Sequence, residues 1–146
     1  MTKVQIIQGT PEHCEVLSAL HSTSFSKPWN NESFAALLEQ PGVAAWISED
    51  SEPTGFILLR ATADEAEILT FAVAPNYRRA GLGTLLLKTA LHALQASGTK
   101  TMFLEVSVKN PTAIGLYKEC GFRPSGVRPA YYGNKNTRVT ADAIIM

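Results

Sequence analysis

The chain has little of what several specialised classes of protein need. It contains two cysteines, Cys14 and Cys120, which are too few for a disulfide framework and show no spacing typical of a metal site. Its 13 basic side chains balance 13 acidic ones, so the composition gives no indication of binding to nucleic acid or to a membrane surface. We therefore expect free thiols, no metal and no direct nucleic-acid partner.

Long apolar runs are missing as well. No stretch approaches the length of a membrane span, and the first residues, Met1 to Gln5, lack the apolar core of a signal peptide. We therefore expect a cytosolic protein. The 146 residues have the size of one ordinary domain, and without repeats or a linker they predict a single domain over residues 1–146.

The spacing of apolar residues changes between that of strands and that of helices. Capping residues and prolines predict helices that begin near Thr10, Asn30 and Asn110, and Phe25 is expected in the buried stripe of the first. Strands are predicted at residues 3–8, 43–48, 55–61, 66–74, 101–108, 122–127 and 138–146, with a turn at 50–53. The strand 66–74, the helix 82–97 and the strand 101–108 form a β-α-β crossover, whose strands should be parallel. This order predicts an α/β fold with an antiparallel portion.

The stretch from Arg78 to Thr84 lies between a buried-looking strand and a strongly helical run. Gly81 and Gly83 leave the backbone N–H groups at the helix N-terminus unobstructed, and Arg78 and Arg79 add positive charge, so an anion such as phosphate is the natural ligand. Glycines before a helix are often only turn residues. The spacing Arg-x-x-Gly-x-Gly is neither the dinucleotide fingerprint nor a P-loop, which points to a different phosphate-bearing ligand.

Two side chains stand out as candidates for proton transfer. Glu105 lies in the middle of a predicted strand, where it either faces solvent at an edge or serves as a general base. Tyr117 is predicted on the face of a helix that it shares with Ala113 and Cys120, where it is either a core residue or a phenol that protonates a leaving group. The histidines form no constellation and no nucleophile elbow is present, so covalent catalysis has little support, and Cys120 at a helix C-terminus is a poor thiolate.

The segment from Val73 to Gly83 resembles the acyl-CoA-binding motif of the GNAT superfamily of N-acyltransferases. The resemblance implies acetyl-CoA as cosubstrate, with its pyrophosphate on the loop backbone and its pantetheine arm on the main chain of the preceding strand. It also implies a mixed, mostly antiparallel central sheet with a parallel β-α-β core and helices on both faces. The residues implied in binding acetyl-CoA are Phe71, Ala72, Val73, Arg78, Arg79, Ala80, Gly81, Leu82, Gly83, Thr84 and Asn110.

Shorter segments are similar to one subgroup, the RimI-type ribosomal-protein-alanine N-acetyltransferases. They are Phe25-x-x-Pro28-Trp29, Leu104-Glu105-Val106, Asn110, Ala113-Ile114-x-Leu116-Tyr117, Gly121-Phe122, Arg128-x-x-Tyr131-Tyr132 and Asp142 to Met146. The similarity implies Glu105 as general base and Tyr117 as general acid. The acceptor peptide is expected between the 26–30 break and the 131–132 loop, with Trp29, Tyr131 and Tyr132 as contacts. Arg128-Pro129-Ala130 replaces a more basic run, which bears on substrate affinity.

The function that this resemblance implies is transfer of an acetyl group to the N-terminal α-amine of a protein. The expected acceptor is the N-terminal alanine of a small-subunit ribosomal protein. Two alternatives stay open at this point: a GNAT enzyme that acetylates a small amine or lysine, and a CoA-binding module without catalysis.

Overall fold

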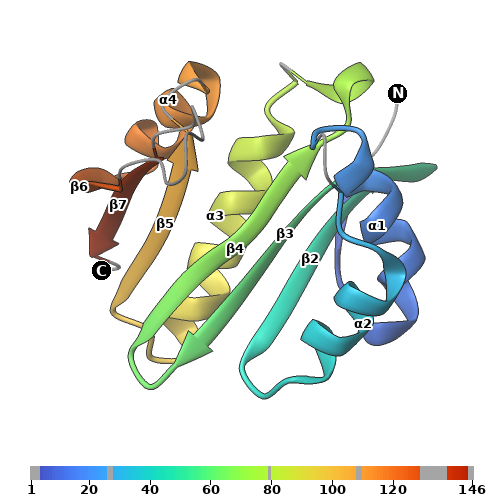
Figure 1. Ribbon diagram of the computed structural model, residues 1–146, viewed down its shortest axis with the longest axis horizontal. Coiled ribbons are helices and arrows are strands. Elements are labelled where there is room, and N and C mark those ends of the chain that lie inside the picture. Colours follow the sequence, from blue (N-terminus) through green and yellow to red (C-terminus); the bar gives the residue numbers. More distant parts are fainter. Residues whose placement is uncertain (1–3, 26–27, 79, 108–109, 129–137, 145–146) are drawn as a thin grey trace.

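The computed structural model describes residues 4–25, 28–78, 80–107, 110–128 and 138–144. Its centre is a seven-stranded sheet in the order β1-β2-β3-β4-β5-β7-β6 (Figure 1). The strands are β1 (Gln5–Gln8), β2 (Val43–Asp50), β3 (Glu52–Thr62), β4 (Glu65–Val73), β5 (Thr101–Ser107), β6 (Arg123–Arg128) and β7 (Arg138–Ile144). The helices are α1 (Cys14–Ser22), α2 (Asn31–Glu39), α3 (Leu82–Ala96) and α4 (Pro111–Glu119), with short 3-10 turns η1 (Pro11–His13) and η2 (Pro75–Tyr77).

The pairing of the strands confirms the predicted mixed, mostly antiparallel sheet. Every neighbouring pair is antiparallel except β4 and β5, which are parallel and are joined by α3. The predicted β-α-β crossover is therefore confirmed. None of the described helices is long and apolar enough to cross a membrane.

Helices cover both faces of the sheet, as predicted (Figure 1). One apolar core lies between the sheet and α3 and α4, and includes Leu86, Met102 and Tyr117. A second core lies on the opposite face beneath α1 and α2, and includes Leu17 and Phe34. The two cores hold the sheet rigidly, which fixes the position of the loops at the strand ends.

A β-bulge in β4 decides which side chains face each core. The register between β3 and β4 shifts at Leu69, which has no partner residue on β3. Ile68 belongs to the core beneath α3, and after the bulge Phe71 and Val73 pack against this same core, whereas Ala72 belongs to the core beneath α1. Without the extra residue, the period of two would send Phe71 and Val73 to the other face.

The parallel strands β4 and β5 pair over a short distance and then diverge. Pairing is limited to Glu65 with Thr101, Ala66 with Met102 and Glu67 with Phe103. Beyond these residues β5 stays paired with β7, and β4 stays paired with β3. The C-terminal halves of the two strands are thus separated within one sheet, and Figure 1 shows them spreading apart towards the end where α3 begins and α4 lies.

Two local predictions are wrong. The turn predicted at residues 50–53 is shorter, because Ser51 takes a φ of 65° and lets Asp50 pair directly with Glu52. Pro53 lies in β3, where a register shift accommodates it. Phe25 is not buried with the stripe of α1, since 39% of its surface is exposed.

Candidate active site

The N-terminus of α3 has the geometry of an anion site. Gly81 is its N-cap with a φ of 81°, and no side chain caps the helix there. A Cβ at Gly81 would meet nothing within 4 Å, so the space in front of the first N–H groups is open. Because the positive end of a 15-residue helix lies here, the loop favours an anion, as predicted from its sequence.

Gly83 lets three elements approach one another at this end of α3. A Cβ built at Gly83 would lie 3.2 Å from Leu116 of α4, 3.7 Å from Phe71 and 3.9 Å from Val73 of β4. The strand predicted to hold the pantetheine arm and the loop predicted to hold the pyrophosphate therefore lie side by side. A larger residue at position 83 would push Leu116 away.

Arg78 uses its guanidinium within the protein. Its Nε donates to the carbonyl oxygen of Val73 at 2.9 Å, and its Nη2 donates to Oγ of Ser24 at 2.8 Å. The side chain thus links the end of β4 to the segment that follows α1. Arg79, the second predicted cation, lies outside the described residues.

Asn110 caps α4 with its side chain. Its Oδ1 accepts the backbone N–H of Ala113 at 3.2 Å, and Pro111 follows at the first helical position. The sequence predicts this cap and the proline after it. Proline destabilises the helix little at its first position, since it lacks the N–H that would be unpaired there. The cap fixes the start of the helix that carries Tyr117.

Tyr117 is buried on the α4 side of the sheet, with 8% of its surface exposed. Its ring lies 6.1 Å from that of Phe71 and 5.6 Å from that of Phe122, measured between centroids. Burial raises the pKa of the phenol well above its ordinary value, so Tyr117 is protonated at neutral pH. The protonated phenol therefore belongs to a ring that lies beside Phe71 of the predicted pantetheine strand.

Glu105 lies on β5, half-buried, on the opposite face from Tyr117. Its neighbours Leu104 and Val106 belong to the core beneath α3 and α4, and alternation along a strand directs Glu105 to the other face. The carboxylate lies beyond the paired part of β4 and β5, at the level where the two strands have separated. Glu105 and Tyr117 therefore lie on opposite faces of the sheet.

Cys120 offers no competing nucleophile. Burial raises the pKa of the half-buried Cys120 thiol, an effect that nearby Lys88 opposes and Glu119 reinforces. The thiol is therefore a weak nucleophile at neutral pH. In the described part of the chain, no three His, Cys, Asp or Glu side chains are grouped as a metal site would require.

Of the three predicted acceptor contacts, the structure describes Trp29. It is half-buried and packs against the core beneath α1 and α2. Its backbone N–H donates to Nδ1 of His21 at 3.1 Å, and its carbonyl oxygen accepts from Oγ of Ser18 at 2.8 Å. Tyr131 and Tyr132 lie outside the described residues.

Ser18 and His21 were missed by the sequence analysis, which found no constellation of histidines. The sequence contains only part of the signal for the contacts of His21. His21 precedes three aromatic residues, Phe25, Trp29 and Phe34, at a distance along the chain that allows an aromatic cluster. Which atoms meet depends on how the chain folds back after α1, and the sequence does not show this.

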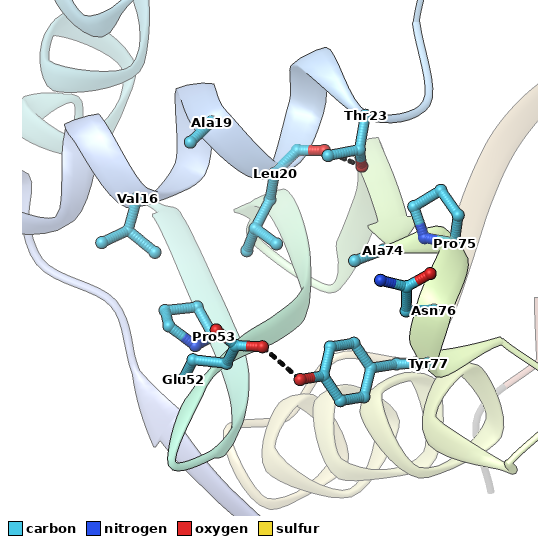
Figure 2. A pocket seen from close by; sticks show the side chains of 10 residues that line it. All are labelled: Val16, Ala19, Leu20, Thr23, Glu52, Pro53, Ala74, Pro75, Asn76 and Tyr77. Carbon is cyan, nitrogen blue, oxygen red and sulfur yellow. Dashed lines mark hydrogen bonds between the residues drawn. The ribbon is translucent and has the colours of Figure 1, made fainter.

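A pocket of about 430 Å³ lies on the α1 side of the sheet (Figure 2). It is framed by α1, by the turn between β2 and β3, and by η2, and Glu52 accepts a hydrogen bond from the Tyr77 hydroxyl at its edge. Its lining contains none of the predicted site residues that the structure describes. The pocket is therefore adjacent to the loop that begins at Arg78 but separate from the divergence of β4 and β5.

The open N-terminus of α3 beside the parallel pair of β4 and β5 agrees with the acyl-CoA-dependent N-acyltransferase class that the sequence motif indicates. The model of the acetyltransferase (GNAT) family matches residues 14–122. The chain belongs to this family and is an acetyl-CoA-dependent N-acetyltransferase.

Named relatives cover most of the chain. A ribosomal protein bS18-alanine N-acetyltransferase of Escherichia coli (strain K12) is 34% identical over 119 residues, which are 82% of this chain and 79% of the relative. A candidate enzyme of the same description from Bacillus subtilis (strain 168) is 32% identical over 147 residues, covering 99% of this chain and 95% of the relative. The crystal structure of the Escherichia coli ribosomal-protein-S18-alanine N-acetyltransferase has the same fold, with a TM-score of 0.90 at 24% identity over 98% of this chain and 94% of that one.

Proposed function

We propose that this enzyme acetylates the N-terminal α-amine of a protein, and that its acceptor is the N-terminal alanine of a small-subunit ribosomal protein. The observation that carries the proposal is the identity of 34% to an enzyme named for ribosomal protein bS18-alanine acetylation. The motifs shared with the RimI-type subgroup include the segments around Glu105, Tyr117 and Trp29. A cytosolic location belongs to the same proposal, because ribosomal proteins are made there.

Acetyl-CoA would be held by main-chain groups of two adjoining elements. The loop from Arg78 to Thr84 would bind the pyrophosphate at the N-terminus of α3. Phe71 to Val73 would bind the pantetheine arm along the free edge of β4 left by the divergence of β5. Asn110 would contact this arm from the start of α4. When bound, acetyl-CoA supplies the activated acetyl group.

Glu105 and Tyr117 would divide the proton transfers between them. Glu105 would accept a proton from the acceptor amine, directly or through water, on the face of the sheet that bears α1 and α2. The amine nitrogen would then bond to the thioester carbonyl carbon while the bond from this carbon to sulfur breaks. Tyr117 would protonate the departing sulfur, and a main-chain N–H near Val73 would polarise the carbonyl.

The chemistry of the acceptor supports an α-amine over a lysine. An α-amine has a pKa of about 8, whereas that of lysine is about 10.4. Freeing the lysine amine at neutral pH therefore costs roughly 3 kcal/mol more. A single carboxylate base such as Glu105 is therefore adequate for deprotonating an α-amine and less adequate for deprotonating a lysine.

A panel of short peptides with different first residues, each with an internal lysine, tests the proposal. After incubation with the enzyme and acetyl-CoA, mass spectrometry should show acetylation of the α-amine of alanine-first peptides. Acetylation of the internal lysine, or of small amines such as polyamines alone, would replace the proposal by the alternative acceptors.

Glu105→Gln tests the assigned base in the same assay. It removes the proton acceptor and keeps the shape, so turnover should fall by about 10²-fold or more while the acetyl-CoA Kd stays within about twofold. Turnover equal to that of the parent enzyme would remove Glu105 from the mechanism.

A further inference from the structure

Both peptide groups that flank the Trp29 side chain are held by side chains of α1. Ser18 Oγ donates to the Trp29 carbonyl oxygen at 2.8 Å, and His21 Nδ1 accepts the Trp29 N–H at 3.1 Å. Residues three apart on a helix lie on the same face, so the two side chains approach Trp29 together. We call this arrangement of Ser18, His21 and Trp29 the Trp29 clamp.

The hydrogen bond to Nδ1 defines the state of His21. An N–H donor requires a lone pair on Nδ1, so the imidazole is neutral and its proton lies on Nε2. With 2% of its surface exposed, His21 is among the few buried polar residues of the described chain. Burial lowers its pKa, which favours the same neutral state.

Aromatic rings surround the imidazole. The ring of Phe25 stacks on it at 4.1 Å and 16°, and that of Trp29 stacks at 5.0 Å and 23°. Phe34 of α2 and Phe56 of β3 complete the cluster, at 5.5 and 6.3 Å. The clamp therefore ties the segment around Trp29 to the rigid core of the sheet as well as to α1.

The Trp29 clamp fixes the main chain on the face of the sheet where the acceptor is proposed to bind. Asn30, the residue after Trp29, caps α2 by accepting the N–H of Ser33 at 2.8 Å, so the main chain is fixed on both sides of this peptide. Trp29 lies on the face of the sheet that also bears Glu105, where the acceptor amine must arrive. A shift of the Trp29 backbone would move the acceptor side of the site, whereas the start of the loop at α3 is also held by the hydrogen bond from Arg78 to the Val73 carbonyl oxygen.

We propose that Ser18 and His21 are positioning residues that hold the Trp29 backbone as one wall of the acceptor-binding site. The inference rests on the proposed function and deepens it, since it assigns acceptor affinity to two helix residues that need not touch the acceptor. Its signature is a change in the KM of the acceptor peptide without a matching change in the KM of acetyl-CoA or in kcat.

The test uses steady-state kinetics with an alanine-first peptide and acetyl-CoA. Ser18→Ala should raise the peptide KM about fivefold, because one net hydrogen bond is lost. His21→Phe keeps an aromatic ring but leaves the Trp29 N–H without an acceptor, and should raise it at least about tenfold. The KM of acetyl-CoA and kcat should stay within about twofold in both variants.

Three matched variants separate positioning from general destabilisation. Ser18→Thr keeps the hydroxyl and should restore the parent peptide KM. His21→Asn offers an oxygen near the place of Nδ1 and should lie between the parent and His21→Phe. Ser22→Ala removes an α1 hydroxyl that donates to Ala19 of its own helix at 2.7 Å, and should leave the peptide KM unchanged.

The outcomes separate this inference from the proposed function. A parent enzyme that transfers acetyl groups to no α-amine overturns both. An active parent whose Ser18→Ala and His21→Phe variants melt at lower temperature but keep the parent peptide KM overturns the clamp alone. Equal increases in the peptide and acetyl-CoA KM values would also overturn it, because they would place the effect in the common scaffold.

Discussion

Arg78 and Ser24 are joined by a hydrogen bond of 2.8 Å, although they are 54 positions apart in the chain. The same guanidinium binds the carbonyl oxygen of Val73, the last residue of β4. One side chain thus connects the start of the loop at α3 with the segment that leads to Trp29. Because these two regions are predicted to bind different substrates, Arg78 is placed to affect both.

Arg78→Ala should weaken binding of acetyl-CoA by releasing the end of β4, with an increase in KM of about three- to tenfold. Acetyl-pantetheine, which lacks the pyrophosphate, distinguishes two origins of this loss. If the guanidinium acts through Val73, the variant should lose the same factor with both donors. A loss confined to acetyl-CoA would instead show direct contact with the pyrophosphate. Ser24→Ala, which removes one of the two bonds, should have a smaller effect.

Gly81→Ala should impair acetyl-CoA binding more than stability alone explains. At a φ of 81° an alanine is strained by about 1 to 2 kcal/mol. Its methyl group would also enter the open space in front of α3, where the pyrophosphate is expected. Gly98 is a matched control, since it has a φ of 96° and nothing within 4 Å of its Cβ position, but lies at the other end of α3.

Thermal unfolding and the KM of acetyl-CoA together test this expectation. Gly81→Ala and Gly98→Ala should lower Tm to a similar extent, because the backbone strain is similar. The KM of acetyl-CoA should rise in Gly81→Ala alone. A similar KM in both variants would argue against an anion site at this helix N-terminus.

The sequence was sufficient for the parts of the fold and site that depend on local patterns. The β-α-β crossover follows from apolar spacing, and the caps at Asn30 and Asn110 follow from residue types that accept backbone N–H groups. The loop at Gly81 follows from a glycine where the backbone needs a positive φ. Each of these features is encoded within a few neighbouring residues.

The features that the sequence analysis missed depend on contacts between distant segments. The Trp29 clamp joins residues eight and eleven positions apart across a change of direction. The link from Arg78 to Ser24 joins residues 54 positions apart in the chain. The predicted turn around Ser51 was too long, because a serine with a positive φ is uncommon and the residue types at 50–53 do not indicate so tight a turn.

The pH dependence of His21 gives a further test of the Trp29 clamp. Burial lowers the pKa of His21 in the folded protein below its ordinary value of about 6.5. The neutral ring therefore stabilises the fold above that pH, and this contribution is lost as the pH falls through the lowered folded pKa. The side chains that contact the imidazole from α2, β3 and the segment after α1 are aromatic rings, which carry no charge. A charged group in this region is Arg78, which donates a hydrogen bond to Ser24, three residues after His21.

The difference in Tm between the parent and His21→Phe isolates the pH-dependent contribution of His21 to stability. It should shift in favour of His21→Phe as the pH is lowered below about 6.5, because phenylalanine cannot be protonated. Protonation of Nδ1 in the folded protein would also break the bond to the Trp29 N–H, so the parent peptide KM should rise as the pH falls through the lowered folded pKa. A difference that stays constant from pH 7 to pH 5 would mean that His21 has the same pKa in the folded and the unfolded protein.

Tyr117→Phe should separate the chemical role of the phenol from its packing role. Phenylalanine keeps the ring contacts with Phe71 and Phe122, so Tm should change little. The pKa of the buried phenol is raised, which keeps the proton on the oxygen at neutral pH, and the phenol would give up this proton only to the negative charge that develops on the sulfur. Loss of this donor should lower kcat by about 10²-fold or more, with both KM values nearly unchanged. If Tyr117→Phe lowers Tm but not kcat, Tyr117 is a core residue and the sulfur takes its proton from solvent.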